Sequence, residues 1–138
     1  MNYTLEDIKK QSPYPIGELN TAYAKYFVGN SYLYPINSEE IHISNVTFEP
    51  GCRNNWHIHH GAGQILFCTA GRGYYQEWGK PAQELNVGDT VYIAPEVKHW
   101  HGAAPHSYFV HIAESVPNKN ASNEWLEAVD EEEYLKLK

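Results

Sequence analysis

The sequence predicts an all-β protein, a sandwich or barrel of short strands with a short peripheral helix near each end. Apolar residues recur in short alternating runs, which favours strands over long helices. Clusters of Gly, Pro and Asn interrupt these runs. The resulting strands follow one another at a regular spacing, which is typical of sandwiches and barrels.

We expect ten strands, each bounded by turn-forming residues. They span residues 22–28, 31–35, 41–48, 56–59, 64–69, 73–78, 84–85, 90–93, 99–101 and 107–113. Turn signals occur at residues 49–51, 71–73, 86–89 and 94–96.

The two ends of the chain are predicted to be helical. Thr4 is a suitable N-cap for a short helix over residues 5–10. A second helix over residues 130–137 is acidic at its start and carries lysines at its end, as the helix dipole favours. Both helices are expected to be peripheral.

Length, charge and cysteine content limit the class of protein. A chain of 138 residues fits one domain with a substantial core. A net charge of -7 with scattered Lys and Arg argues against a nucleic-acid partner. No apolar run is long enough for a membrane span, and the first ten residues do not resemble a signal peptide. We therefore expect a cytoplasmic protein in which Cys52 and Cys68 stay reduced.

The segment "NWHIHHGAGQILF" contains three histidines within four positions. Side chains alternate between the two faces of a strand, so His57 and His59 point to one face and His60 to the other. A His-x-His pair can bind one metal ion, although histidines on strands are also common as structural or exposed residues. We expect His60 to be exposed or to lie in an interface.

Further histidines make a shared site the simpler interpretation. A second His-x-His pair occurs at His99 and His101, and His111 lies within another apolar strand. Seven of the eight histidines fall between positions 57 and 111. Neutral imidazoles suit divalent Mn, Fe, Co, Ni, Cu or Zn, and the amide oxygen of Gln64 is able to complete the set of ligands.

The spacing of these residues resembles the cupin superfamily. Its first motif is Gly, five residues, His-x-His, three or four residues, Glu, six residues, Gly. Here the motif reads Gly51, "CRNNW", His57-Ile58-His59, "HGAG", Gln64, "ILFCTA", Gly71, with Gln in place of Glu. The second motif reads Gly88, "DTVYI", Ala-Pro-Glu, "VK", His99, where the family has Pro-x-Gly before the histidine.

The resemblance implies a double-stranded β-helix, the jelly-roll-like cupin barrel, over residues 21–115, between an N-terminal segment (1–20) and a C-terminal tail (116–138). It also implies a divalent metal, manganese first, with iron, nickel and zinc as alternatives. By position in the motifs, the metal ligands are His57, His59, Gln64 and His99.

A longer pattern, including "GQILF", "AGRGYYQEWG" and "KHWHGAAP", is similar to the small manganese cupins that include bacterial hydroxynitrile lyases. This similarity implies a lyase acting on a small organic substrate, with the metal as Lewis acid. A neutral Gln ligand leaves more of the metal charge uncompensated than Glu does, which favours anionic ligands.

His111 and His101 are the candidate catalytic residues, with His111 first as general base beside a metal-bound hydroxyl. Each is alternatively a core histidine satisfied by a backbone carbonyl. Other readings stay open: an iron-dependent dioxygenase, a non-catalytic cupin that binds a small molecule, or an ion that only stiffens the barrel. Aromatic residues on the N-terminal strands further predict a homodimer.

Overall fold

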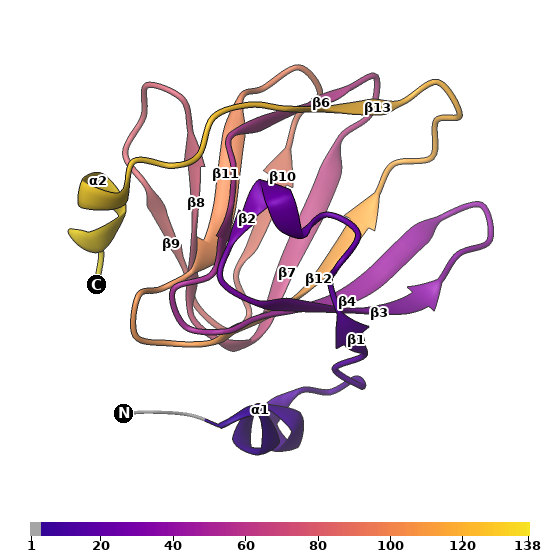
Figure 1. Ribbon diagram of the computed structural model, residues 1–138. Helices are drawn as coiled ribbons and strands as arrows, with labels where there is room; N and C mark the ends of the chain where they lie inside the picture. Colours follow the sequence, from indigo (N-terminus) through magenta and orange to yellow (C-terminus); the bar gives the residue numbers. More distant parts are fainter. Residues whose placement is uncertain (1–3) are drawn as a thin grey trace.

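The computed structural model describes residues 4–138, which form two antiparallel sheets with the helices α1 (Leu5–Gln11) and α2 (Glu131–Leu135) outside them (Figure 1). In the first sheet the order is β1 (Glu18–Leu19), β3 (Ser31–Asn37), β4 (His42–Phe48), β12 (Phe109–Ser115), β7 (Gln64–Gly71) and β10 (Thr90–Ile93). In the second it is β13 (Ser122–Trp125), β6 (His57–His60), β11 (His99–Ala103), β5 (Arg53–Asn54) and β2 (Phe27–Val28), while β8 (Gly73–Glu77) pairs with β11 and with β9 (Gln83–Leu85).

The main core lies between the two sheets. Phe48 and Leu66 of the first sheet and Tyr75 and Ala103 of the second belong to one buried apolar cluster. This burial on facing sheets is the principal stabilising contribution to a small β-barrel. The predicted all-β fold is therefore confirmed.

Each terminal helix covers a smaller apolar cluster. Ile8 of α1 (Leu5–Gln11) packs with Tyr108 and Val110. Tyr134 of α2 (Glu131–Leu135) packs edge-on against the fully buried Trp100, with ring centres 5.8 Å apart. Figure 1 shows α2 beside β8 and β9 and α1 below β1 and β4.

The helix predictions are confirmed, with small changes in their bounds. Thr4 forms a capping box with Asp7, in which the Thr4 hydroxyl accepts from the Asp7 N–H and the Asp7 carboxylate accepts from the Thr4 N–H. Asp130 caps α2 by accepting from the backbone N–H of Glu133.

The prediction of a strand over residues 22–28 is wrong, because its first part forms the 3-10 helix η1 (Ala24–Tyr26) and only Phe27–Val28 is extended. The Asn20 side chain accepts from the N–H of Tyr23. Such local hydrogen bonds from Asn compete with strand pairing and favour turns. The short strands β1, β5 and β13 were absent from the prediction.

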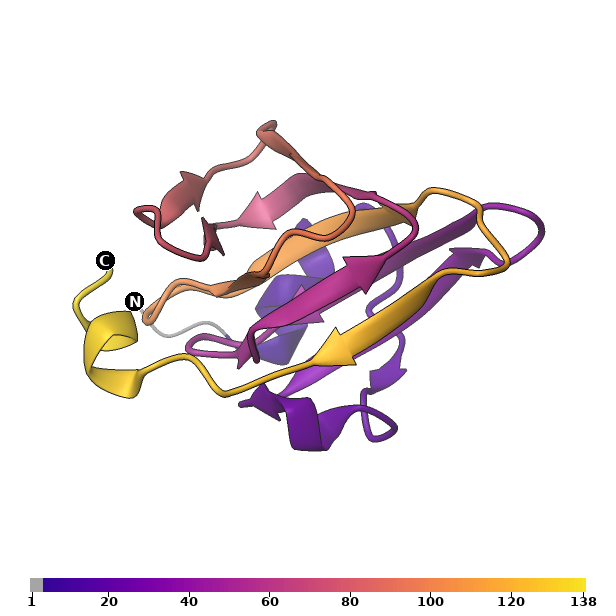
Figure 2. The ribbon, with the colours of Figure 1, turned by 90° about the horizontal axis from the view of Figure 1, so that it is seen from above.

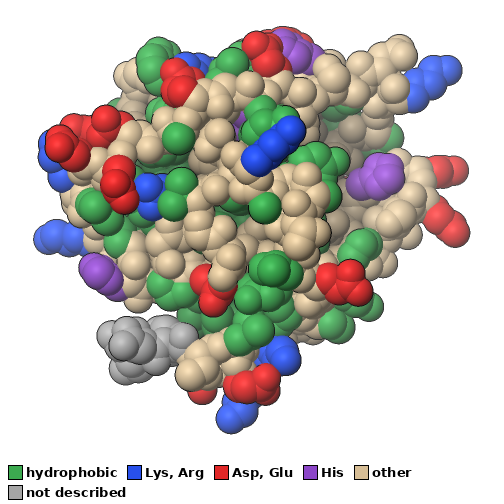
Figure 3. Space-filling model, viewed as in Figure 1, with side chains coloured by type: hydrophobic (Ala, Val, Ile, Leu, Met, Phe, Trp, Pro, Cys, Tyr) green, Lys and Arg blue, Asp and Glu red, His purple; other side chains and the backbone are tan. Residues whose placement is uncertain are grey.

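Other expectations concern the surface and the cysteines. On the face shown in Figure 3, acidic and basic side chains are interspersed and form no basic patch. No helix in the described part of the chain has the length and apolar character needed to cross a lipid bilayer. Cys52 and Cys68 are both buried free thiols, as predicted.

Candidate metal centre

A cavity of about 270 Å³ opens between the two sheets. Its lining combines aromatic and aliphatic side chains with histidines and neutral polar groups. The lining residues are Asn20, Tyr23, Phe27, Ser31, Leu33, His42, Ser44, Val46, Phe48, Asn54, His57, His59, Gln64, His101, His111, Ala113, Ser115, Asn123 and Trp125. No Asp, Glu, Lys or Arg of residues 4–138 is among them.

Strand pairing brings the two His-x-His segments together. His57 of β6 is the register partner of His99 of β11, and their ring centres lie 4.2 Å apart. One ring nitrogen from each of His57, His99 and His101 lies within 4.8 Å of the others, so this group could hold a metal ion. Neutral imidazoles at such a separation suit a divalent transition metal.

His59 lies close to the same group. Its ring centre is 5.1 Å from that of His57 and 4.9 Å from that of His99, whereas the ring centre of His101 is 6.3 Å from that of His57. Nitrogen separations thus favour His101 as the third histidine, and ring separations favour His59.

His57 and His99 each have one nitrogen held by a backbone carbonyl two residues earlier. Nδ1 of His57 donates to the Asn55 oxygen at 2.8 Å, and Nδ1 of His99 donates to the Val97 oxygen at 2.9 Å. A carbonyl only accepts, so Nδ1 carries the hydrogen and Nε2 keeps the lone pair that a metal requires.

The remaining nitrogen of His99 supports a ligand role. Its Nε2 is buried and has no hydrogen-bond partner among the described residues. Buried polar atoms in folded proteins nearly always have a partner. An unpaired lone pair next to His57 therefore fits a metal ligand better than a structural histidine.

Burial keeps these rings neutral. It holds the pKa of His57 well below its ordinary value and lowers that of His99 as well. Burial likewise lowers the pKa of His59 to about 4, with neighbouring His99 adding to the effect. Neutral imidazole is the form that binds a metal, so the rings are ready to coordinate at neutral pH.

Gln64 lies at the start of β7 and also lines the cavity. Its Nε2 donates to the Ser115 hydroxyl at 3.4 Å, which turns the amide nitrogen toward β12. The amide oxygen faces the other way and is the atom that a metal would bind. The structure thus places His57, His59 and Gln64 on the wall of one cavity, and strand pairing places His99 beside His57.

The two candidate catalytic histidines lie side by side. The ring centres of His101 and His111 are 5.1 Å apart at 87°, and His111 also stacks on Phe109 at 4.3 Å. Neither nitrogen of His111 has a partner in the described chain, so the predicted alternative of a backbone-satisfied core histidine does not hold for it. Burial lowers the pKa of His111 to about 3.

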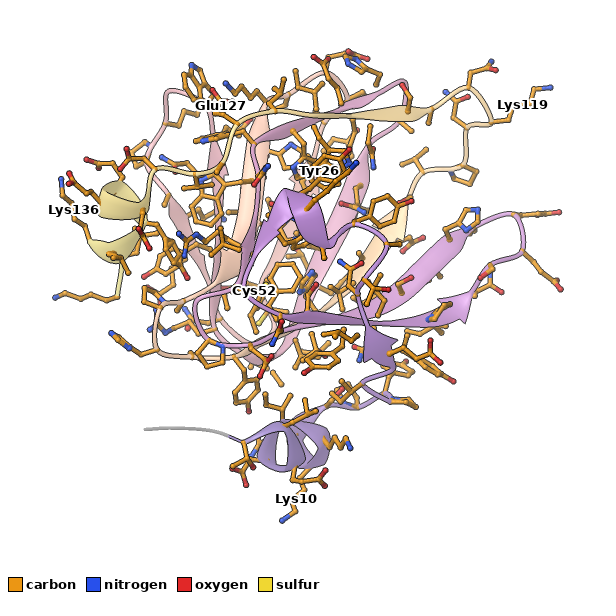
Figure 4. All side chains as sticks on the ribbon, viewed as in Figure 1. Lys10, Tyr26, Cys52, Lys119, Glu127 and Lys136 are labelled. Carbon is orange, nitrogen blue, oxygen red and sulfur yellow. The ribbon has the colours of Figure 1, made fainter. Side chains whose placement is uncertain are left out.

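Sequence reasoning missed several residues of the cavity. Trp125 of β13 lies opposite His57 in the strand register, with ring centres 4.7 Å apart. Tyr26 stacks on the same indole at 4.7 Å, and Figure 4 shows Tyr26 on the side of η1 nearest β13. The tetrapeptide "SNEW" is too short and polar to signal a strand, so no pattern in it pointed to the site.

The facing sheets and the histidine-lined cavity define a small barrel with a candidate metal centre. Residues 44–110 match the cupin domain. The chain is 43% identical over 91 residues to an (R)-mandelonitrile lyase from Granulicella tundricola. The aligned region covers 66% of this chain and 69% of that protein. The chain belongs to the cupin family.

Solved structures agree with this assignment. A cupin-like protein from Thermotoga maritima is 41% identical, with a TM-score of 0.83 over 91% of this chain and 96% of its own. The DMSP lyase DddQ from Ruegeria pomeroyi is 18% identical, with a TM-score of 0.60 over 83% of this chain and 59% of its own. At that identity the likeness shows the shared fold alone.

Proposed function

We propose that this protein is a metal-dependent lyase that splits small 2-hydroxynitriles into a carbonyl compound and hydrogen cyanide. The observation that carries the proposal is a cavity that no charged side chain of residues 4–138 lines and whose wall includes His57, His59, Gln64 and His111. The 43% identity to an (R)-mandelonitrile lyase supports this reaction class.

His57, His59, His99 and Gln64 would hold the metal, with manganese as the first candidate and iron, nickel or zinc as alternatives. When bound, a divalent ion supplies Lewis acidity that makes a substrate hydroxyl more acidic. Four neutral ligands leave the ion's charge uncompensated, and the cavity lining offers no carboxylate to reduce it. Such a site favours anionic oxygen and cyanide over neutral molecules.

His111 is assigned the proton transfers. Burial lowers its pKa to about 3, so the neutral ring is a weak base and would accept the proton from a substrate hydroxyl that a bound ion makes acidic. As this proton moves, the electron pair on oxygen forms the carbonyl bond and the carbon–carbon bond to the nitrile breaks. The bonding pair leaves with cyanide. Cyanide then takes the proton back from His111 and departs as hydrogen cyanide, so the histidine returns to its neutral state.

The apolar wall of the cavity suits an aryl or alkyl substituent on the hydroxyl-bearing carbon. Phe27, Phe48 and Trp125 contribute aromatic surface to it. Offset or edge-on aromatic contacts favour a phenyl ring at such a wall.

The test is turnover of mandelonitrile by protein loaded with Mn²⁺, compared with the His111→Phe variant. We expect kcat to fall about 10²- to 10⁴-fold, as for loss of a general base, while Mn²⁺ content stays the same. Equal turnover by the variant would remove His111 from the mechanism. Activity that requires Fe²⁺ and consumes oxygen would instead identify a dioxygenase, and Mn²⁺ binding without turnover of any 2-hydroxynitrile a binding protein.

A further inference from the structure

Two segments outside the matched cupin domain meet at the ring of His57. Residues 44–110 match that domain, whereas η1 precedes it and β13 follows it. The two segments touch each other, because the Tyr26 ring stacks on the Trp125 indole with ring centres 4.7 Å apart and planes 5° from parallel. Their contacts at His57 are therefore additions to the matched domain.

Trp125 packs against the His57 ring. The register of β13 on β6 places Trp125 directly opposite His57, and both side chains line the cavity. The ring centres lie 4.7 Å apart and the planes are tilted by 34°. The half-buried indole thereby covers one side of an imidazole that is only 2% exposed.

The hydrogen bond at Nδ1 holds only one edge of the His57 ring. This nitrogen donates to the Asn55 oxygen at 2.8 Å. The χ2 torsion of histidine has broad energy minima, so one hydrogen bond does not by itself fix the direction of Nε2. The Trp125 indole occupies the space beside the ring and restricts its swing. The two contacts together hold the ring in one orientation.

Asn55 ties this hydrogen bond to the same two segments. Its backbone N–H donates to the Tyr26 oxygen at 2.8 Å, and its side-chain Nδ2 donates to the Leu126 oxygen at 3.2 Å. Its own carbonyl is the group that accepts from His57. The acceptor at the edge of the ring and the indole beside the ring therefore belong to one connected network.

We propose that Trp125 is a positioning residue for the metal centre, which holds the His57 ring in the orientation that binds the ion. The proposal rests on the metal-binding part of the proposed function and is independent of the reaction that follows. Groups that orient a histidine ligand raise metal affinity, and the loss of one costs about 10- to 100-fold. Because Trp125 also lines the cavity, the test measures metal binding without substrate.

The primary experiment is the Mn²⁺ affinity of the full chain, measured by titration calorimetry after a chelator has removed any bound metal. In Trp125→Ala the affinity should fall about 10- to 100-fold. Trp125→Phe keeps a ring beside His57 and should recover most of this loss. Trp78→Ala is the matched control and should keep the wild-type affinity, because Trp78 packs on Trp56, in the apolar cluster that α2 covers.

The EPR spectrum of bound Mn²⁺ separates positioning of the ligand from general support of the fold. At saturating metal the Trp125→Ala spectrum should broaden, because a loosened ring samples several positions, and the Trp78→Ala spectrum should match the wild type. Thermal melts of the chelator-treated variants report the loss of packing alone. A lowered melting temperature in Trp125→Ala, with wild-type Mn²⁺ affinity and spectrum, would overturn the proposal.

A double variant tests whether Trp125 acts through His57. In the His57→Ala background the Trp125→Ala substitution should cause no further loss of Mn²⁺ affinity, since the ring that it positions is gone. A further loss as large as in the wild-type background would show another route to the metal and overturn the assignment. Where Trp125→Ala does not fold, Trp125→Leu keeps apolar bulk without a flat ring and replaces it in every comparison.

The outcomes distinguish this proposal from the proposed function. Absence of lyase activity in a wild type that binds Mn²⁺ would reject the reaction and leave the comparison of affinities standing. Equal Mn²⁺ affinity in the wild type and Trp125→Ala would overturn the role of Trp125 alone. A wild type that binds none of Mn²⁺, Fe²⁺, Ni²⁺ and Zn²⁺ would overturn both.

Discussion

His59 and His60 are adjacent in β6, yet they occupy opposite chemical environments. His59 lines the inner cavity, where burial lowers its pKa to about 4. His60 lies on the outer face between Glu124, at 2.7 Å, and Glu96, and these hydrogen bonds raise its pKa. One peptide unit therefore separates a neutral imidazole that can bind a metal from one that favours the protonated, ion-paired form.

The comparison teaches that the face of the strand, rather than residue type, determines the proton chemistry. The inner face removes water and offers no carboxylate, so desolvation decides the pKa. On the outer face water remains and two carboxylates stabilise the charge. Figure 2 shows β13, which carries Glu124, running alongside β6.

Metal binding should show the largest contrast between the faces. Replacing the inner His57 with Ala should weaken Mn²⁺ binding more than roughly 100-fold, since loss of even an outer partner of a ligand costs 10- to 100-fold. The His60→Ala variant should bind Mn²⁺ like the wild type. Calorimetric titration with Mn²⁺ of both variants, after a chelator has removed any bound metal, measures the two affinities. Equal affinities would contradict the proposed difference between the inner and outer faces of β6.

The next largest effect should be the loss of stability at acid pH in protein freed of metal by a chelator. His57, His59, His99, His101 and His111 all have lowered pKa values in the folded state. From pH 6.5 down to about 4 the unfolded chain binds more protons than the folded chain, so the free energy of unfolding falls as pH falls. Each fully buried histidine contributes at most ~1.4 kcal/mol per pH unit.

Thermal melts between pH 7 and pH 4 check this, with His111→Phe as the matched variant. Removing one buried titrating group should make the decline shallower, whatever the change in absolute stability. A decline as steep as in the wild type would show that the His111 ring does not resist protonation.

His60 should give the smallest effect, with the opposite sign. Because its folded pKa is raised, its contribution to stability is fully present below its unfolded pKa of about 6.5 and is lost as pH rises through the folded value. His60→Gln should therefore lower the melting temperature slightly at pH 5.5 and leave it unchanged at pH 9. High salt should reduce the difference at pH 5.5, since the pair is solvent-exposed.

Much of the site follows from local pattern. Two-residue alternation correctly placed His57 and His59 toward the cavity and His60 away from it. Thr4 marked the start of the first helix, because its side chain satisfies a backbone N–H in the first turn. The acidic start and lysine-bearing end of residues 130–137 indicated the second helix, whose N-cap in the structure is Asp130.

Periodicity misled at residues 22–28, where alternating apolar residues suggest a strand but the hydrogen bond from the Tyr23 N–H to the Asn20 side chain starts a turn. Other features could not be predicted, because they depend on contacts between distant segments. Trp125 reaches the cavity only because β13 pairs with β6, whose residues lie 62 to 68 positions earlier in the chain.

The sequence by itself determined the strand-rich fold, the faces on which the histidines lie and the terminal helices, since these follow from periodicity and from side chains acting within a few residues. The tertiary structure alone decided which side chains share the site, because that depends on pairing between strands that are distant in the chain. The pairing of β6 with β11 brings the ring of His57 to 4.2 Å from that of His99, and the pairing of β6 with β13 adds Trp125.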